Sequence, residues 1–453
     1  GDASGEKPAS ELYGAYLALV YAGAIFGGYV ADKLIGYQRS ILLGAVVMSA
    51  GLFLLASPTE SMFKLGLATI IVGNGLFKPI ISTMVGKLYA QGDERRDSGF
   101  TIFYMGINLG ALLAPLVTQY LAKKIFGIED MPAYKIVFIS AGIGMLLSLV
   151  WFWLGRGQLK GIGLPAPHQA GLRNVSLVLL FGVLVGIPLF YALLTIDAGL
   201  LQGILMALFV IPAIMLLREG VVEGQVSRDK VMAMLTIFVF NVLFWMFFEQ
   251  AGSSFNFLAD KIVDRDIGMQ GLFQALAGTN DFPVAWFQSV NSVAIIALAP
   301  VLAWLWVKMG KNNPIIPRKF GLGLIFNGLA FLLLMVALSS MVDDAGKIPF
   351  WTLFMVYVIQ SVGELCLSPI GLSMVTKLAP VRLVGFGMGG WFLSTAIGNN
   401  LSGIFASHVS GEGGMSVESA LSGYTFGFWV LVGSGVFLFL IAPLIQKLMH
   451  GVK

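Results

Sequence analysis

The chain has 453 residues, of which 57% are hydrophobic and only 11% are charged. Since soluble domains carry about 25% charged residues, this composition excludes a soluble enzyme, a disordered chain and a nucleic-acid-binding protein. The net charge of +4 fits a membrane protein, whose basic residues gather in cytoplasmic loops. We therefore expect an all-α polytopic membrane protein.

Apolar segments long enough to cross a bilayer recur along the whole chain. A helix needs about 20 apolar residues to span the hydrocarbon core. The segments that meet this length predict thirteen spans, which are Leu12–Val30, Ser40–Ala56, Phe63–Tyr89, Gly99–Leu121, Tyr134–Gly155, Leu172–Leu194, Leu200–Leu217, Val231–Leu258, Val284–Val307, Phe320–Met341, Phe350–Thr376, Leu383–Ala406 and Tyr424–Leu448.

Lysine and arginine are divided unequally between the two sets of alternate loops. The loops after odd-numbered spans carry 19 of them, and the opposite loops carry 8. Since basic loops stay in the cytoplasm, we expect the C-terminus inside and the residues before Leu12 outside. An external N-terminus without a signal sequence indicates at least one further span upstream of Gly1.

Two polar stretches divide the predicted spans into groups. Residues 1–155 form an N-terminal bundle of five spans, and residues 156–171 form a cytoplasmic linker rich in glycine, proline and basic residues. Residues 172–229 form two extra, lipid-facing helices and a polar connecting loop. Residues 230–453 form a bundle of six. With one upstream span, this pattern resembles the two six-helix halves of the major facilitator superfamily, which bind substrate between the halves.

Three charged residues lie deep inside predicted spans, namely Lys78, Glu249 and Glu364. The other 49 of the 52 formal charges fall in loops or at helix ends. A charge at this depth is costly unless it faces water or a partner, so such residues are functional by default. The alternative is that Lys78 pairs with one glutamate only to pack the bundle.

Polar residues at intervals of four accompany each of these charges and predict a shared polar lumen. Because no histidine lies in mid-span, proton coupling would have to use a carboxylate. A carboxylate that alternates between a dry pocket and a lysine neighbour can load and release a proton. The three polar faces consist of Asn74, Lys78 and Ser82, of Asn241, Trp245 and Glu249, and of Gln360, Glu364 and Ser368.

Several longer motifs resemble one transporter family. GGYVADKLIGYQR at Gly27–Arg39 resembles the cytoplasmic loop motif of the major facilitator superfamily, and FYMGINLGALLAP at Phe103–Pro115 resembles the signature of the proton-dependent oligopeptide transporters, the POT family. FFEQAGSS at Phe247–Ser254, QSVNS at Gln288–Ser292 and GELCLSPIGLSMVTKLAP at Gly363–Pro380 match further motifs of that family. The resemblance implies two six-helix bundles with a central two-helix insertion, fourteen helices in all, of which this sequence holds thirteen.

The resemblance also implies roles for individual residues. Lys78 matches a family lysine that serves substrate binding and proton coupling. Glu249 matches the partner of that lysine, which is also a candidate protonation site. Glu364 matches a residue that binds the amino terminus of the peptide. The positions that line the peptide pocket match Tyr21, Asn108, Asn291, Ser368 and Trp391.

Other readings of these polar and aromatic residues stay open. Asn108 can equally donate a hydrogen bond between helices. Trp245 and Phe248 are candidates for the pocket wall or for ordinary packing. The resemblance places Asp32 in a cytoplasmic gate network, where it would pair with Lys33 or Arg39, although these charges also suit a loop cap that sets the topology.

Two positions depart from the family pattern. Family members carry an ExxER motif on their first helix, and no such motif occurs in this sequence. Its absence agrees with the upstream span that the topology indicates. Ile80 stands where the family usually has asparagine after Lys-Pro.

The expected function is import of di- and tripeptides with protons by alternating access. The alternatives are another solute on the same scaffold, such as a nitrate- or drug-like molecule, or a non-transporting receptor or channel. With one cysteine and no visible nucleophile–base pair or metal cluster, we expect no enzyme activity and no cofactor besides the proton gradient. We expect a monomer in the bacterial inner membrane, whose partners are peptides, protons and lipid and not nucleic acid.

Overall fold

The computed structural model describes residues 5–89, 95–128, 132–380 and 383–452, and the regular structure within these ranges is helical, apart from an isolated β-bridge between Val263 and Ile348. The first membrane-length helices form the N-terminal half, and short π-helical segments at Ala31–Ile35 and Tyr120–Ile125 extend two of them. These helices are α1 (Glu6–Val30), α2 (Tyr37–Leu55), α3 (Glu60–Lys87), α4 (Arg95–Gln119) and α5 (Tyr134–Gly155).

The rest of the chain forms a hairpin and a C-terminal half. In the hairpin, α6 (Leu172–Phe181) and α7 (Ile187–Thr195) are joined by a π-helical turn, and α8 (Ala198–Glu223) returns antiparallel to them. Short 3-10 turns occur at Arg156–Leu159, Pro167–Gln169, Val284–Trp286 and Gly310–Asn312. The C-terminal half consists of α9 (Gln225–Phe248), α10 (Ser254–Lys261), α11 (Gln270–Ala277), α12 (Phe287–Met309), α13 (Ile316–Ser340), α14 (Phe350–Leu378), α15 (Val384–Ser410) and α16 (Val417–Leu448).

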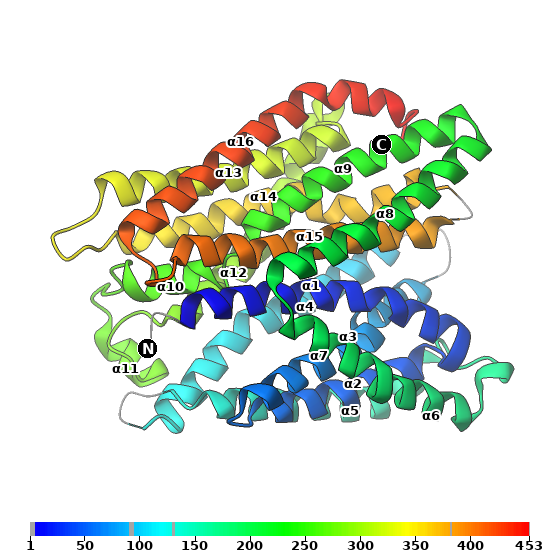
Figure 1. Ribbon diagram of the computed structural model, residues 1–453, viewed down its shortest axis with the longest axis horizontal. Helices are drawn as coiled ribbons and strands as arrows, with labels where there is room; N and C mark the ends of the chain where they lie inside the picture. The colour runs from blue at the N-terminus through cyan, green and yellow to red at the C-terminus, as the bar shows by residue number, and fades with distance from the viewer. Residues whose placement is uncertain (1–4, 90–94, 129–131, 381–382, 453) are drawn as a thin grey trace.

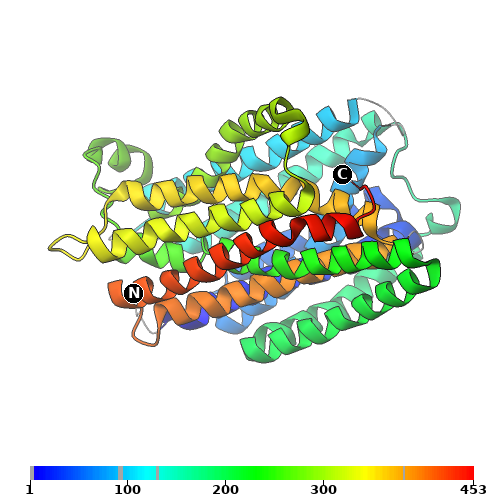
Figure 2. The ribbon, with the colours of Figure 1, turned by 90° about the horizontal axis from the view of Figure 1, so that it is seen from above.

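The two halves lie side by side with their helices roughly along one axis (Figure 1). In the N-terminal half α2 packs on α3 and α5, and in the C-terminal half α13 packs on α14 and α16. The halves meet where α1 packs along α15 and α4 packs on α12. The hairpin touches both halves, α7 on α3 and α8 on α15 and α9, and Figure 2 shows it on the outside of the bundle.

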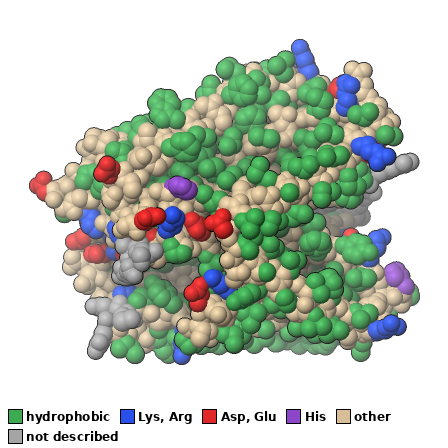
Figure 3. Space-filling view, viewed as in Figure 1, with side chains coloured by type: hydrophobic (Ala, Val, Ile, Leu, Met, Phe, Trp, Pro, Cys, Tyr) green, Lys and Arg blue, Asp and Glu red, His purple; other side chains and the backbone are tan. Residues whose placement is uncertain are grey.

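Twelve helical segments of the described ranges are long and apolar enough to cross a membrane. The predicted span that is missing from those twelve is Leu383–Ala406, which corresponds to α15 and is a helix as predicted. Its sequence is rich in glycine, serine and asparagine, and its polar side chains, such as Asn399 and Asn400, are buried against neighbouring helices. The surface agrees with a membrane location, since Figure 3 shows hydrophobic side chains across the middle and charged ones toward the two ends.

Two predicted boundaries are wrong. The span Val231–Leu258 is not one helix, because α9 ends at Phe248 and α10 begins at Ser254. The polar sequence Arg218–Lys230 is not a loop, because α8 continues to Glu223 and α9 starts at Gln225. The only break there is Gly224, whose φ of 118° lies in the region that favours glycine.

Aromatic packing anchors the break between α9 and α10. Phe247, just before the break, and Phe255, just after it, are fully buried and contact the ring of Phe331 on α13. Within the break, the backbone N–H of Gln250 donates to Phe248 O at 2.8 Å, and that of Ser253 donates to Gln250 O at 3.1 Å. The interruption is therefore a structured turn, and it places Glu249 at the end of a helix.

Candidate functional site

Lys78 is an exposed cation inside a membrane-length helix. It precedes the end of α3 by nine residues, which is about 13 Å along the helix axis. Its ammonium lies 4.9 Å from the centre of the Tyr21 ring on α1, a distance at which a cation is attracted to the ring face. Two residues that the family resemblance assigned to peptide binding, Tyr21 and Lys78, are therefore neighbours.

Glu364 on α14 is held by a neighbour on α12. The Asn291 side-chain amide donates to Glu364 Oε2 at 3.1 Å and to the Ser361 hydroxyl at 2.8 Å. This arrangement fixes the direction of the carboxylate and brings together two of the predicted pocket residues. Ser368, one turn further along α14, is half-buried.

Glu249 occupies the first position of the turn after α9. Its backbone N–H donates to Trp245 O at 3.2 Å, and its own carbonyl accepts a hydrogen bond from the Ser402 hydroxyl at 2.6 Å. The side chain is half-buried and interacts electrostatically with Glu364 and with Lys78. One cation from the N-terminal half and two carboxylates from the C-terminal half thus form one electrostatic group.

Two tyrosines belong to this group although no prediction singled them out. Tyr104 on α4 interacts electrostatically with Glu364 and by hydrogen bonding with Asn108. Tyr13 on α1 interacts with Glu249 and lies against Gly252, where an added Cβ would be 2.2 Å from the tyrosine ring. Tyr104 lies within the FYMGINLG motif, so the motif held a signal for it, whereas Tyr13 lies in no recognised motif.

Three predicted lumen residues make contacts within their own half of the molecule. Trp391 is 7% exposed and packs edge-on against Phe238 and Phe320 inside the C-terminal half. The Asn108 amide donates to Tyr104 O of its own helix at 3.0 Å. The predicted wall residue Trp245 donates its ring N–H to the side chain of Asn241, at 3.0 Å.

Two of the predicted polar faces are only partly lumenal. The fully buried Asn241 donates to Ser394 and Thr395 on α15, at 2.9 and 3.1 Å. Gln360 donates to Asn327 on α13 at 2.9 Å. Both side chains connect helices within the C-terminal half.

The predicted latch between Asp32 and Lys33 or Arg39 stays a prediction, and in the described structure Asp32 and Arg39 contact other groups. The Asp32 carboxylate accepts a hydrogen bond from the Tyr37 hydroxyl. The Arg39 guanidinium donates to the carbonyls of Gln169 and Ala170, at 3.3 and 2.9 Å. The arginine therefore fastens the linker to the N-terminal half.

The linker at 156–171 is docked on the turn that joins α1 and α2. The Gln38 amide donates to Ile162 O at 2.7 Å, and the Gln169 amide donates to Asp32 O at 2.7 Å. An added Cβ at Gly36, whose φ is 77°, would lie 2.7 Å from the Cα of Pro165. The segment therefore packs closely on the N-terminal half.

The two ends of the seam between the halves differ. At the Glu6 end of α1, the buried Glu6 carboxylate forms an ion pair with Lys261 of α10 and accepts a hydrogen bond from the backbone N–H of Met415 at 2.8 Å. Near this end the backbones of α1 and α15 touch, since a Cβ added to Gly14 would lie 2.6 Å from the Cα of Gly403. The halves are closed at the Glu6 end.

At the Asp32 end the same two helices separate. Phe26 and Tyr29 of α1 are 69% and 65% exposed, and Phe386 of α15 is 42% exposed. Figure 3 shows the surface indented between the halves at this end, on the right of the view. The structure therefore opens toward the end of the molecule that carries the linker and the C-terminus (Figure 1).

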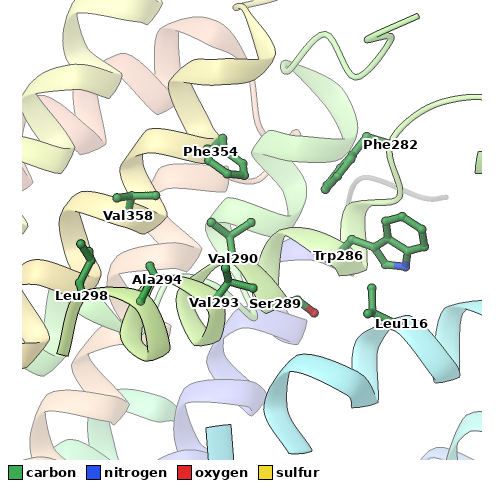
Figure 4. A pocket seen from close by; sticks show the side chains of 11 residues that line it. Leu116, Phe282, Trp286, Ser289, Val290, Val293, Ala294, Leu298, Phe354 and Val358 are labelled. Atoms are coloured by element: carbon green, nitrogen blue, oxygen red, sulfur yellow. The ribbon is translucent and has the colours of Figure 1, made fainter. Parts of the chain in front are cut away.

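Two cavities lie apart from the charged group. One of about 360 Å³ is lined by apolar side chains of α12 and α14, by Trp286 and by Leu116 of α4 (Figure 4). The other, of about 580 Å³, is polar and lies between Tyr134 of α5 and Asp260 and Arg265 of the other half. Among the described residues no group of three or more histidine, cysteine, aspartate or glutamate side chains is arranged to hold a metal ion.

Known proteins resemble this chain over most of its length. The Uncharacterized transporter YclF of Bacillus subtilis (strain 168) is 34% identical over 96% of this chain and 85% of its own length. Dipeptide and tripeptide permease A of Proteus mirabilis (strain HI4320) is 34% identical over 98% of this chain and 88% of its own length. Peptide transporter YePEPT of Yersinia enterocolitica is 32% identical over 90% and 80%.

Solved structures share the fold. A crystal structure of peptide transporter POT in complex with sulfate is 34% identical, covers 98% of this chain and 88% of that chain, and has a TM-score of 0.81. A mutant of peptide transporter POT in complex with alafosfalin gives 34% identity, coverage of 98% and 87%, and a TM-score of 0.81. A POT family transporter in complex with 5-aminolevulinic acid is 28% identical, covers 97% of this chain and 88% of that chain, and has a TM-score of 0.78.

These matches confirm the predicted all-α major facilitator architecture and the family resemblance. The family model described as the POT family matches residues 38–413, which is most of the chain. The segments that carry the charged group, from Lys78 to Glu364, all lie inside that range. This chain is an integral membrane protein and belongs to the POT family.

Proposed function

We propose that this protein is a symporter that uses the proton gradient to import di- and tripeptides by alternating access. The observation that carries the proposal is the electrostatic group at the seam, where Glu249 of the C-terminal half interacts both with Lys78 of the N-terminal half and with Glu364. Relatives named as dipeptide and tripeptide permeases support the same substrate class. A peptide zwitterion carries opposite charges at its two ends, so it is complementary to groups that are split in this way.

In this proposal each charged residue has one task. Lys78 binds the carboxylate of the peptide and responds to proton binding, and Glu364 binds the amino terminus. Glu249, with charges of both signs nearby, carries the coupled proton. The side chains that complete the pocket are Tyr21, Asn108, Asn291, Ser368 and Trp391, of which Asn291 acts by orienting Glu364 and Trp391 by packing behind the wall.

We also propose that the protein works as a monomer in the bacterial inner membrane with its C-terminus in the cytoplasm. The charged side chains visible at the C-terminal end are mostly basic, as cytoplasmic ends are (Figure 3). With that orientation the open Asp32 end faces the cytoplasm. Turnover then needs no cofactor, because the proton gradient supplies the energy.

The proposal is tested in liposomes that contain the purified protein. With the outside more acidic than the inside, labelled dialanine should accumulate above its external concentration, and dissipating the gradient should abolish the accumulation. Protein-free liposomes are the control. Saturable accumulation of 5-aminolevulinic acid without accumulation of dialanine would contradict the peptide assignment and retain the transporter, since a POT relative is solved with that compound.

A substitution of Glu364 tests the site for the amino terminus. Glu364→Ala should raise the KM for dialanine about tenfold or more, because a charged hydrogen bond contributes about 1.5–3 kcal/mol. Competition by an N-acetylated dipeptide should change much less, since its amino end carries no charge. Glu418→Ala, which removes a carboxylate from the first turn of α16, is the matched control. Equal effects on both peptides would assign Glu364 another role.

A further inference from the structure

The turn that holds Glu249 is fastened by a hydrogen-bond chain that the proposed function does not use. A helix break inside a membrane leaves backbone groups without partners, and these must be satisfied by protein or by water. At this break the partner of the Glu249 carbonyl is the hydroxyl of Ser402 on α15, at 2.6 Å. The partner of the Met246 carbonyl is the side-chain amide of Gln250, at 3.1 Å.

The chain runs in one direction through four side chains. The Tyr424 hydroxyl of α16 donates to Ser254 at 3.0 Å, and the Ser254 hydroxyl donates to the side-chain oxygen of Gln250 at 2.6 Å. The amide nitrogen of Gln250 donates to the Ser402 hydroxyl at 3.0 Å, and Ser402 donates to Glu249 O. Each serine hydroxyl thus donates once and accepts once, so all four bonds are compatible with a single arrangement of protons.

All four side chains are buried. Tyr424, Ser254 and Gln250 are fully buried, and Ser402 is 1% exposed. A hydrogen bond lost at such a site is not replaced by water, so the cost of leaving the partner unsatisfied is high. The chain therefore fixes the backbone of Glu249, and through it the direction in which the carboxylate leaves the turn.

The same stretch of α15 also touches the N-terminal half. Gly403, the neighbour of Ser402, is in backbone contact with α1, since an added Cβ at Gly403 would lie 2.6 Å from Ser10 O and 2.8 Å from the Cα of Gly14. Tyr13, the neighbour of Gly14, lies against Gly252 of the turn. Any separation of α1 from α15 at the closed end thus acts on both sides of the turn that holds Glu249.

We propose that Gln250 and Ser402 are positioning residues that hold the Glu249 turn in register with α15, so that the contact between α1 and α15 governs the position of the Glu249 carboxylate. This inference rests on the proposed function, because it assigns a positioning device to the proposed proton site. Ser402 is the residue at which α15 meets the Glu249 turn. Tyr424 and Ser254 anchor the outer end of the chain.

The test compares two measurements on each variant in liposomes. One is dialanine accumulation driven by a proton gradient, and the other is dialanine counterflow at equal pH, which needs binding and alternation but no net proton movement. Ser402→Ala should lower accumulation about tenfold and lower counterflow less than twofold. Ser402→Thr keeps the hydroxyl and should restore accumulation, and the pH at which uptake is half-maximal should shift in Ser402→Ala alone.

A matched control separates positioning from helix packing. Ser407→Ala removes a buried hydroxyl from the same helix, but that hydroxyl donates to Ile404 O of α15 itself at 2.7 Å. Ser407→Ala should retain the ratio of accumulation to counterflow of the unmodified protein. If Ser402→Ala does not fold, Tyr424→Phe tests the positioning role in its place. Tyr424→Phe should lower accumulation about threefold and leave counterflow unchanged.

The outcome distinguishes this inference from the proposed function. Glu249→Gln, measured alongside, should lose accumulation and keep counterflow. If Glu249→Gln loses accumulation while Ser402→Ala and Tyr424→Phe keep the unmodified ratio, the positioning inference is overturned and the proton site stands. If Glu249→Gln keeps full accumulation, the proposed proton site itself is overturned.

Discussion

Replacing Lys78 with alanine is expected to abolish proton-driven accumulation of dialanine, with a loss of at least tenfold. Lys78 is the cation of the electrostatic group, and it interacts with Glu249 across the seam. An opposite charge close by favours the ionised form of a carboxyl group, so the lysine is needed for Glu249 to release its proton. The same substitution removes the charge that would bind the peptide carboxylate. The measurement is accumulation in liposomes under an inward proton gradient.

The control for this substitution lies on the same helix. Lys64 forms an ion pair with Glu60 at 2.6 Å near the start of α3, about 21 Å from Lys78 along the axis. Lys64→Ala loses a surface ion pair, which contributes only about 0.3–0.5 kcal/mol, and should transport normally. Wild-type accumulation by a folded Lys78→Ala variant would contradict the assignment of Lys78 to coupling and leave it a packing role.

The charged group was predictable from sequence because charge is scarce in this chain. Once the spans are known, any charged residue in mid-span is a candidate functional residue. This reasoning found Lys78, Glu249 and Glu364 without any knowledge of the fold. The spacing of their polar neighbours predicted a shared lumen, and the structure adds that Glu249 interacts with both Lys78 and Glu364. Asn291 was indicated only by its motif, and its hydrogen bond to Glu364 is a contact between α12 and α14.

The errors have identifiable causes. The span Val231–Leu258 contains the polar run EQAGSS at Glu249–Ser254, and counting the segment as one helix overlooked this signal of a break. The backbone of the break is satisfied by Ser402 and Gln250. Periodicity placed Asn241 and Gln360 on the same faces as the charges, but their hydrogen bonds run to α15 and α13. A polar residue in a buried helix can face the lumen or another helix, and spacing alone does not distinguish the two.

The ion pair between Glu6 and Lys261 is expected to control how readily the closed end opens. It joins α1 of one half to α10 of the other, and the Glu6 side chain is 6% exposed, whereas that of Lys261 is 34% exposed. Breaking a fully buried pair costs about 3–5 kcal/mol. Because Lys261 is partly solvated, we expect about 1–2 kcal/mol, which is roughly a tenfold change in the equilibrium between closed and open forms.

Charge reversal tests this coupling with its own internal control. Glu6→Lys places two cations together at the closed end and should favour its opening, and Lys261→Glu should do the same with two carboxylates, so each should lower dialanine accumulation about tenfold. The double variant restores the attraction and should recover most of the activity. Recovery will be incomplete, because lysine at position 6 cannot accept the hydrogen bond from Met415 N.

The size of the recovery is the decisive quantity. Two residues that act independently give additive losses, so the double variant would then be about a hundredfold impaired, whereas a direct pair makes the double variant better than either single one. Lys7→Ala is a matched control, since Lys7 lies next to Glu6 and pairs only loosely with the exposed Glu412 at 3.9 Å. Additive losses in the double variant would show that the pair does not hold the seam closed, and closure would then rest on the backbone contact between α1 and α15 at Gly14 and Gly403.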